Sequence, residues 1–342
     1  MYSLIRPLLF ALPPEASHNL ALSALKVVSY LNTGEKSHAI PGQTVKVMGL
    51  DFPNPIGLAA GLDKNGDYID ALATAGFGFL EIGTITPRPQ AGNPKPRLFR
   101  LPEHKAIINR MGFNNQGVDY LLKQVNRARY QGILGINIGK NVDTPVERAV
   151  HDYLLGLHKV YKYADYITIN ISSPNTPGLR SLQYGEELQQ LLRRLKQEQK
   201  ILADQTQRYV PLAVKLAPDL DQAAIQSMAQ VILETQMDAV IATNTTLDKT
   251  VVATSKYGAE QGGLSGAPLT ESSTRVIRAF HKALAGQVPI IGVGGIMTGA
   301  DAQAKLEAGA SLVQVYSGLI YRGLGLVKQC VKATNQAPEE LG

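Results

Sequence analysis

Residues 170–178 read Asn-Ile-Ser-Ser-Pro-Asn-Thr-Pro-Gly and combine amide and hydroxyl side chains with two prolines. They follow residues 166–169, an alternating and β-branched run that is typical of a buried strand. Amides donate and accept hydrogen bonds, hydroxyls can move a proton, and proline restricts the backbone, so the segment could hold a small polar substrate. The same composition is common in ordinary polar turns, and this segment alone leaves both interpretations open.

The elements that would position this segment are short β-like runs that alternate with amphipathic helical stretches, such as residues 186–202 and 222–233. This alternation predicts an α/β fold, a (β/α)₈ TIM barrel. A doubly wound sheet is the alternative, but residues 57–64 lack its glycine-rich dinucleotide fingerprint, and the chain has no P-loop motif. The predicted strands are 56–60, 79–83, 133–137, 166–170, 212–216, 239–243, 290–293 and 312–316.

In such a barrel the carboxyl ends of the strands face one shared pocket, and here nearly all of these ends carry polar residues or glycine. The glycines after the seventh and eighth runs predict a phosphate site, for a mononucleotide cofactor or a phosphorylated substrate. Two lysines among these residues could stabilise a reduced flavin or a carboxylate. The strand-end residues are Lys64, Thr84, Asn137, Asn170, Ser173, Lys215, Thr243, Asn244, Thr245, Gly294, Gly295, Tyr316 and Ser317.

The composition bounds the class of protein. The 342 residues are 44% hydrophobic and 18% charged, which is typical of a globular protein. The net charge of +6 suits an anionic ligand or membrane surface, whereas the scattered Lys and Arg residues do not indicate nucleic acid binding. Cys330 is the single cysteine, so no internal disulfide is possible, and the six histidines show no metal-ligand spacing. We therefore expect no metal.

The N-terminal segment allows several interpretations. Residues 4–12 are apolar but interrupted by Pro7, and residues 20–31 have one apolar helical face. The segment predicts two short helices that either lie on a membrane or line an apolar tunnel, or else pack on the core of the protein. A signal peptide is disfavoured because the apolar stretch is short and no small-residue cleavage site is clear.

Two segments interrupt the regular alternation. Residues 86–102 contain five prolines and several basic residues, and loops of this length are usually functional or disordered. Because residues 97–101 could pair as a strand, we predict an ordered excursion over the barrel. Residues 45–54 resemble a hairpin that closes the bottom of the barrel.

Five motifs in the same order resemble the dihydroorotate dehydrogenase family, and the resemblance extends from the N-terminus to about residue 334. Ser173 stands where the cytosolic class of this family has cysteine, and the N-terminal helical segment resembles the quinone tunnel of the membrane-associated class. The resemblance therefore implies the quinone-dependent class of bacterial type. The motifs are residues 59–64 (Ala-Ala-Gly-Leu-Asp-Lys), 109–115 (Asn-Arg-Met-Gly-Phe-Asn-Asn), 137–141 (Asn-Ile-Gly-Lys-Asn), 170–176 (Asn-Ile-Ser-Ser-Pro-Asn-Thr) and 291–295 (Ile-Gly-Val-Gly-Gly).

This resemblance implies oxidation of dihydroorotate to orotate in pyrimidine (UMP) biosynthesis, with FMN as the hydride acceptor and a membrane quinone as the final electron acceptor. Ser173 would be the catalytic base, with Thr176 and Phe113 shaping a water relay for the proton beside it. Residues 176–183 would form a lid over the substrate. The implied substrate residues are Lys64, Asn109, Arg110, Met111, Gly112, Phe113, Asn170, Asn175, Asn244 and Thr245. The implied FMN residues are Ala60, Gly61, Lys64, Thr84, Asn137, Asn170, Lys215, Thr243, Gly266, Gly295, Tyr316 and Ser317.

The resemblance also implies a place for the protein in the cell. Residues 1–40 would be a helical extension that associates peripherally with the cytoplasmic face of the cell membrane, and residues 41–342 would be the FMN-binding barrel. His18 and Arg100 match positions near the quinone headgroup. No nucleic acid and no obligate protein partner are expected.

Two other functions remain open from the residues themselves. One is a flavin-free, phosphate-binding barrel lyase or isomerase that uses Lys64 or Lys215 as a Schiff-base amine. The other is a non-catalytic protein at the membrane that keeps the barrel as a scaffold.

Overall fold

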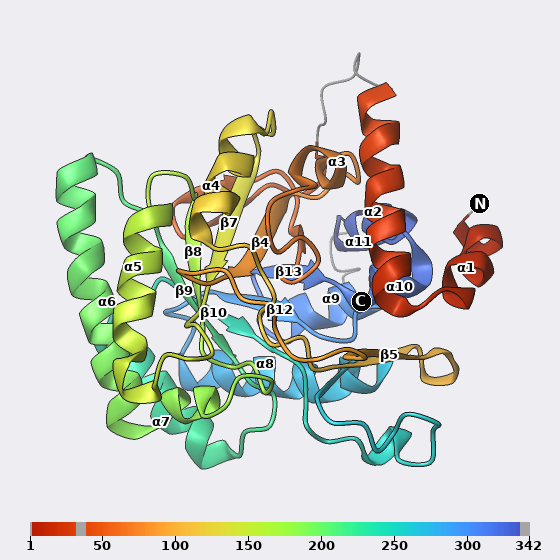
Figure 1. Cartoon of the computed structure of the whole chain (residues 1–342). Helices are drawn as coiled ribbons and strands as arrows, with labels where there is room; N and C mark the ends of the chain where they lie inside the picture. The colour runs from red at the N-terminus through yellow and green to blue at the C-terminus, as the bar shows by residue number, and fades with distance from the viewer. Residues whose placement is uncertain (1, 32–38, 336–342) are drawn as a thin grey trace, which may run out of the picture.

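Eight parallel strands form a closed barrel in this computed structural model, which describes residues 2–31 and 39–335 (Figure 1). The strands follow the order β10-β12-β13-β3-β4-β7-β8-β9, and β9 pairs with β10 to close the ring. Each predicted run overlaps one of them, with β4 and β7 extending two residues and one residue beyond their predicted ends, so the predicted (β/α)₈ barrel is confirmed. The barrel strands are β3 (Ile56–Leu58), β4 (Phe79–Ile85), β7 (Ile133–Ile138), β8 (Tyr166–Asn170), β9 (Leu212–Leu216), β10 (Ala239–Ala242), β12 (Ile290–Val293) and β13 (Leu312–Val315).

Helices surround the barrel and bury its outer face in one continuous apolar core. The two helical stretches that the sequence predicts lie within α6 and α7. The surrounding helices are α3 (Ile69–Ala73), α4 (Val118–Arg127), α5 (Ala149–Val160), α6 (Gly185–Thr206), α7 (Gln222–Glu234), α8 (Thr270–Ala283), α9 (Gly299–Glu307), α10 (Ser317–Arg322) and α11 (Gly325–Thr334). Short 3₁₀ segments are η1 (Pro102–His104), η2 (Val146–Arg148), η3 (Leu179–Gln183), η4 (Thr250–Val252) and η5 (Ala267–Leu269).

A hairpin closes the amino-terminal end of the barrel. Strands β1 (Val45–Val47) and β2 (Leu50–Phe52) pair antiparallel through a turn at Met48 and Gly49, which have positive φ angles of 55° and 77°. The ring of Phe52 is fully buried edge-on against Phe79, with 5.1 Å between the ring centroids. The apolar interior at this end leaves the opposite, carboxyl end of the strands for polar side chains.

A small antiparallel sheet lies over the carboxyl end of the barrel. It consists of β5 (Leu98–Leu101), β6 (Ala106–Asn109) and β11 (Gly263–Gly266), in the order β11-β6-β5. The predicted strand at residues 97–101 therefore exists, and the proline-rich excursion is ordered. Apolar contacts between Phe99, Ile108 and Leu264 hold the sheet together.

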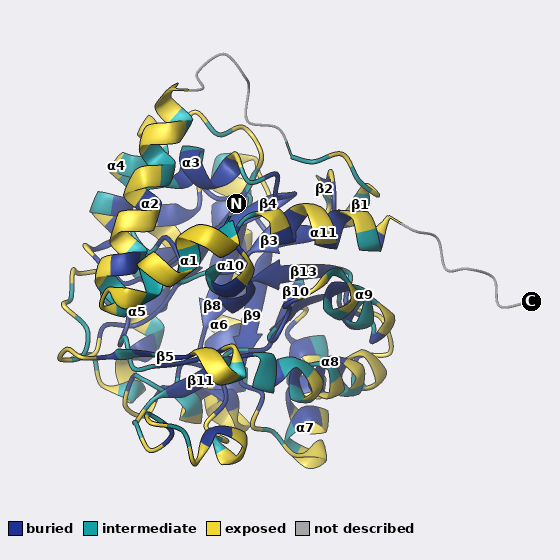
Figure 2. Cartoon of the chain, turned by 90° about the vertical axis from the view of Figure 1, so that its right-hand side faces the viewer, coloured by how far each residue is buried: buried dark blue, intermediate teal, exposed yellow. Residues whose placement is uncertain are grey.

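The N-terminal extension consists of α1 (Tyr2–Ala11) and α2 (Pro14–Leu31), which lie along one side of the barrel (Figures 1 and 2). Helix α1 continues through Pro7, although the sequence suggested an interruption there. Pro7 lies past the first turn, so the helix continues there without the hydrogen bond that a backbone N–H at this position would donate to the carbonyl of Ser3. No helix of the described residues is long and apolar enough to cross a membrane. Residues 32–38, next to the predicted boundary at residue 40, lie outside the described residues.

Candidate active site

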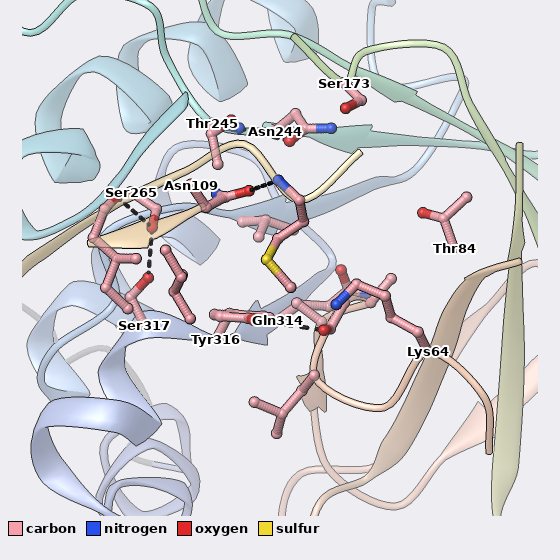
Figure 3. A pocket seen from close by; sticks show the side chains of 18 of the residues that line it. Lys64, Thr84, Asn109, Ser173, Asn244, Thr245, Ser265, Gln314, Tyr316 and Ser317 are labelled. Carbon is pink, nitrogen blue, oxygen red and sulfur yellow. Dashed lines mark hydrogen bonds between the residues drawn. The ribbon is translucent and has the colours of Figure 1, made fainter. Parts of the chain in front are cut away.

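One cavity opens at the carboxyl ends of the barrel strands, and polar side chains from different strands line it (Figure 3). Lys64 follows β3, Ser173 follows β8, and Asn244 and Thr245 follow β10. Side chains from parallel strands converge here because all of these strands run in the same direction around a closed ring. The predicted shared pocket therefore exists.

The small sheet forms the second wall of the cavity. Asn109, at the end of β6, and Ser265, in β11, line it together with Met111, Gly112 and Phe113 from the segment after β6. The cavity is consequently enclosed between the barrel and the excursion that the sequence predicted. Enclosure of this kind lowers the local dielectric constant and strengthens hydrogen bonds to a bound ligand.

A hydrogen-bonded group of side chains surrounds Ser173. The backbone N–H of Asn175 donates to Ser173 Oγ at 3.3 Å, and Asn175 Nδ2 donates to Asn109 Oδ1 at 3.2 Å. Ser173 is buried in the protein, although its hydroxyl faces the cavity. The serine is thus held by the proline-framed loop after β8, next to amides that can bind a planar polar ligand.

Two lysines give the cavity its positive charge, Lys215 being buried and Lys64 partly buried. Burial, together with the charge of the nearby Arg97 guanidinium, lowers the pKa of Lys64 to about 8. Burial also lowers the pKa of Lys215, against the opposing charge of Glu81. Among the described residues, the lysines in salt bridges lie elsewhere, on the protein surface and beside Asp238. Both ammonium groups therefore remain available for an anionic or electron-rich ligand.

A glycine turn after β12 forms the far end of the cavity. Gly294 and Gly295 have φ angles of 125° and 70°, and a Cβ at Gly295 would lie 2.3 Å from the backbone nitrogen of Thr270. Neither glycine amide donates a hydrogen bond to another described backbone group. Opposite them, the Ser317 and Ser265 hydroxyls are hydrogen-bonded at 2.9 Å. Free amides and hydroxyls of this kind suit the oxygens of a phosphate group.

Helix α2 reaches the rim of the same cavity. Glu15 and His18 both line it, and Glu15 forms a salt bridge with Arg97 in which Nε lies 2.9 Å from Oε1. Burial lowers the pKa of His18 to about 4, and the charge of Lys64 contributes. The imidazole is therefore neutral at pH 7.

Comparisons with known proteins agree with this architecture. Residues 43–337 match the family model described as dihydroorotate dehydrogenase. A protein of Acinetobacter baylyi named dihydroorotate dehydrogenase (quinone) is 60% identical over 333 residues, 97% of this chain and 99% of that protein. A protein of the same name from Cellvibrio japonicus is 61% identical over 328 residues, 96% of each chain. The crystal structure of DHODH from Eimeria tenella in complex with ferulenol superimposes with a TM-score of 0.84 at 39% identity, covering 94% of this chain and 90% of that chain.

This chain belongs to the dihydroorotate dehydrogenase family. Most residues that the family resemblance assigned to substrate or FMN do line the cavity of this member. They are Ala60, Gly61, Lys64, Thr84, Asn109, Met111, Gly112, Phe113, Asn170, Ser173, Asn175, Lys215, Thr243, Asn244, Thr245, Gly266, Gly295, Tyr316 and Ser317.

Two residues with assigned roles lie behind the cavity wall of this dihydroorotate dehydrogenase family member. Asn137 is fully buried and accepts a hydrogen bond from Thr84 Oγ1 at 2.6 Å. Thr176 is also buried, and its hydroxyl has no hydrogen-bond partner among the described residues. Their side chains thus lie behind the residues that line the cavity and do not line it themselves.

Two arginines with assigned roles point elsewhere. Arg110 forms a salt bridge with Glu260, with Nη1 2.7 Å from Oε2, and its guanidinium lies over the Phe99 ring. Arg100 donates hydrogen bonds to the carbonyl groups of Leu9, Phe10 and Leu12 at the end of α1. The structure therefore brings His18 to the cavity and uses the Arg100 side chain to fix α1.

Sequence reasoning missed three polar residues of the site. Glu15 lines the rim, and no strand-end argument could reach it because it comes from α2. Asp63 accepts backbone hydrogen bonds from residues 66–68, which fixes the loop that carries Lys64, and burial raises its pKa to about 6. Glu81 is a carboxylate within the buried strand β4, and a charged residue inside such an apolar run was a signal that could have revealed it.

Proposed function

We propose that this protein oxidises dihydroorotate to orotate in pyrimidine biosynthesis and passes the electrons through FMN to a membrane quinone. The observation that carries this proposal is the meeting of Ser173 with Lys64 and several amide side chains in one cavity. Relatives about 60% identical over almost their whole length, named as quinone-dependent dihydroorotate dehydrogenases, support the same activity.

The residues of the cavity fit a flavin mononucleotide. The turn at Gly294 and Gly295, with the hydroxyl of Ser317, would hold the phosphate, and Lys215 would face the electron-rich end of the flavin ring. The bound flavin supplies an acceptor for the hydride from substrate C6. Lys215, buried and positively charged, would stabilise the negative charge that reduction creates.

The substrate would bind beside Ser173. A protonated Lys64 attracts the carboxylate of dihydroorotate, and the amides of Asn109, Asn175 and Asn244 can pair with the ring carbonyl and N–H groups. Since an amide both donates and accepts, a set of them matches an imide better than charged residues would.

Ser173 would remove the proton from substrate C5. A serine hydroxyl is a weak base, so this step needs a route for the proton and stabilisation of the negative charge on the substrate. The unpartnered hydroxyl of buried Thr176 and the ring of Phe113 support a short relay that leads the proton away from the serine. Lys64 supplies the positive charge at the other end of the substrate.

Quinone would approach between the N-terminal helices and the cavity. His18 is neutral because of its lowered pKa, and a neutral imidazole can donate a hydrogen bond to a quinone carbonyl without the cost of burying a charge. Leu4 and Leu8 on α1 are exposed by 79% and 73%. This apolar surface supports peripheral association with the cell membrane, for which we propose the cytoplasmic face.

The test is anaerobic mixing of the purified protein with dihydroorotate while the absorbance of bound flavin is followed. We expect a yellow protein whose flavin absorbance bleaches once when dihydroorotate is added. The absorbance should return when a quinone is added and reoxidises the flavin. A panel of quinones with different side chains would then identify the preferred acceptor. A colourless protein that takes up no FMN, or a flavin that dihydroorotate does not reduce, contradicts the proposal.

A further inference from the structure

The carboxylate of Glu81 lies in the barrel interior beneath the cavity. Glu81, in β4, is fully buried and accepts hydrogen bonds from three side chains. Asn137 Nδ2 donates to its Oε1 at 2.8 Å, while Tyr166 Oη and Gln314 Nε2 donate to its Oε2 at 2.8 and 2.6 Å. A carboxylate with three donors around it is an acceptor only.

A directed chain of hydrogen bonds leads from the cavity to this carboxylate. Asn170 Nδ2 donates to Thr84 Oγ1 at 2.9 Å, and Thr84 Oγ1 donates to Asn137 Oδ1 at 2.6 Å. Asn137 then donates to Glu81. Because Glu81 can only accept, each member of the chain is obliged to donate toward it.

This direction decides what Asn170 presents to the cavity. With its Nδ2 turned to Thr84, its Oδ1 faces the other way and accepts from the backbone N–H of Ser172 at 3.3 Å and from Asn244 Nδ2 at 3.4 Å. The backbone donor of Ser172 cannot turn over, so it supports the same orientation. Thr84, Asn170 and Asn244 all line the cavity, and Figure 3 labels Thr84 and Asn244 there.

We propose that Glu81 is a positioning residue that acts through Asn137 and Thr84 to fix the donor and acceptor atoms of Asn170. The inference rests on the proposed function, in which Asn170 contacts both substrate and flavin. It deepens that function by assigning the orientation of the ligand-binding amides to a carboxylate outside the cavity. The negative charge of Glu81 also favours the ammonium form of Lys215, which burial disfavours.

Replacing this carboxylate by an amide would reverse the chain. In Glu81→Gln the new side chain keeps the hydrogen bonds from Tyr166 and Gln314 only when its Oε1 faces them, and its Nε2 then faces Asn137. Asn137 can meet this donor only by turning its own amide, after which Thr84 accepts from Asn137 and its hydroxyl proton is free to donate to Asn170. Asn170 would then turn its Nδ2 toward the N–H of Ser172, where two donors meet.

The experiment measures orotate binding by the change in flavin absorbance in the FMN-loaded protein. We expect Glu81→Gln to weaken orotate binding by about tenfold or more, as is usual for a mispaired buried donor. Tyr166→Phe is the matched control, because it removes one hydrogen bond to the same carboxylate and keeps both its charge and the chain. We expect Tyr166→Phe to bind orotate within about threefold of the wild type. FMN content and melting temperature are measured for each variant.

A double variant separates orientation from stability. In Glu81→Gln/Asn137→Asp the carboxylate is at position 137 instead of position 81. The new amide at position 81 donates to this carboxylate, and Thr84 again donates to position 137. We expect orotate affinity to return to within about threefold of the wild type. A merely structural role for Glu81 would lower the melting temperature without this rescue.

Several results would overturn the inference. One is Glu81→Gln binding orotate as the wild type does, and another is a folded double variant that binds as weakly as Glu81→Gln. If Glu81→Gln does not fold, the orotate affinity of the double variant tests the inference. A double variant that also fails to fold, while Tyr166→Phe folds, counts against the inference. Wild-type protein that binds FMN but not orotate contradicts the proposed function itself, whereas normal wild-type binding with unchanged variants contradicts the role of Glu81 alone.

Discussion

Ser173 is proposed to remove a proton from the substrate, but its hydroxyl is a weak base because a serine hydroxyl keeps its own proton at neutral pH. Its surroundings must therefore supply most of the assistance. Ser173 is buried, Asn175 donates its backbone N–H to the hydroxyl, and Lys64 lines the same cavity. These contacts orient the serine, whereas the residues proposed to bind the flavin are different ones.

Removing this hydroxyl should separate proton transfer from flavin binding. We expect Ser173→Ala to remain yellow and to slow dihydroorotate-driven flavin reduction by about 10²–10⁴-fold, the usual contribution of a general base. Stopped-flow absorbance in the absence of oxygen measures the rate, and FMN content per chain is the control. A variant that reduces its flavin at the normal rate would show that Ser173 is not the base.

Lys64 should give substrate binding a pH dependence. Its pKa of about 8 means that the ammonium form predominates at pH 7 and is mostly lost by pH 9. A carboxylate ligand needs the charged form, so we expect the affinity for orotate to fall by about tenfold between pH 7 and pH 9. Flavin absorbance titrations at a series of pH values measure it.

A variant with a permanent charge provides the control for this titration. Lys64→Arg stays protonated throughout the range because the pKa of a guanidinium is above about 12. We expect its affinity to be lower than that of the wild type but almost independent of pH. The same slope in Lys64→Arg as in the wild type would assign the pH dependence to another group.

The strand-end residues were predictable from the sequence because parallel strands in a closed barrel all end at one rim. The orientation of individual side chains was not. In a regular strand Thr84 would face away from the side that Glu81 occupies, but the register of β4 against β7 shifts between Gly83 and Ile85. This shift turns Thr84 toward Asn137. No pattern of residue types in the sequence predicts the shift.

At the scale of elements, the loop after β8 is held by one arginine from η3. Arg180 donates to the carbonyl of Ser172 at 3.0 Å and to that of Thr245 at 2.8 Å. Its Nη1 also lies 2.7 Å from Asp219 Oδ2, and the two side chains are 19% and 28% exposed. The arginine thereby joins three loops that carry or adjoin substrate residues.

Weakening this junction should affect substrate binding more than the chemical step. We expect Asp219→Asn to raise the KM for dihydroorotate by about tenfold with a smaller change in kcat, because the loop would spend more time away from its closed position. Asp143→Asn is a matched control, since Asp143 pairs with Arg88 at 2.7 Å but both side chains are about 60% exposed. Equal effects of the two substitutions would show that the junction at Arg180 has no special role.

The elements themselves differ in how readily the sequence reveals them. The eight strands and the helices α6 and α7 follow from apolar periodicity, which burial on one or both faces imposes. The excursion was only partly predictable. Strand β6 pairs with the neighbouring β5 on one side, but on the other side it pairs with β11, about 150 residues later in the chain. Pairing over such a distance depends on the closed barrel, so local sequence cannot specify it.

At the scale of the whole molecule, the N-terminal helices are attached to the barrel through both apolar and polar contacts. Leu22 of α2 joins the main apolar core, and Phe10 of α1 packs edge-on against Tyr321. Tyr2 and Arg6 donate to the carbonyl groups of Ile320 and Tyr321 in α10, and Lys26 donates to the carbonyl of Asp67. No residue of α1 is buried, as Figure 2 shows by its exposed and intermediate colours. Helix α2 contributes only Leu22 to the buried apolar core, and the other core members belong to the barrel and its surrounding helices, so we expect the barrel to fold without this extension.

The exposed face of α1 allows membrane attachment to be tested apart from chemistry. We expect the double variant Leu4→Ser/Leu8→Ser to reduce a short, water-soluble quinone normally but to turn over more slowly with a long-chain quinone in lipid vesicles. The reason is that each buried leucine contributes about 1.5–3 kcal/mol to transfer from water into an apolar phase. Co-sedimentation with the vesicles provides the second measurement, and unchanged sedimentation would rule out this face as the attachment.

Removing the whole extension should divide the catalytic cycle into its two halves. Deleting residues 1–40 takes away His18 and Glu15 at the rim, but it leaves the side chains proposed to hold FMN and dihydroorotate. We therefore expect the rate of flavin reduction by dihydroorotate to change little, while turnover with every quinone falls by at least about tenfold. The two rates are measured separately, by anaerobic stopped flow and by steady-state quinone reduction, with ferricyanide as an acceptor that needs no quinone site. Equal losses in both half-reactions would mean that the helices serve only the folding of the barrel.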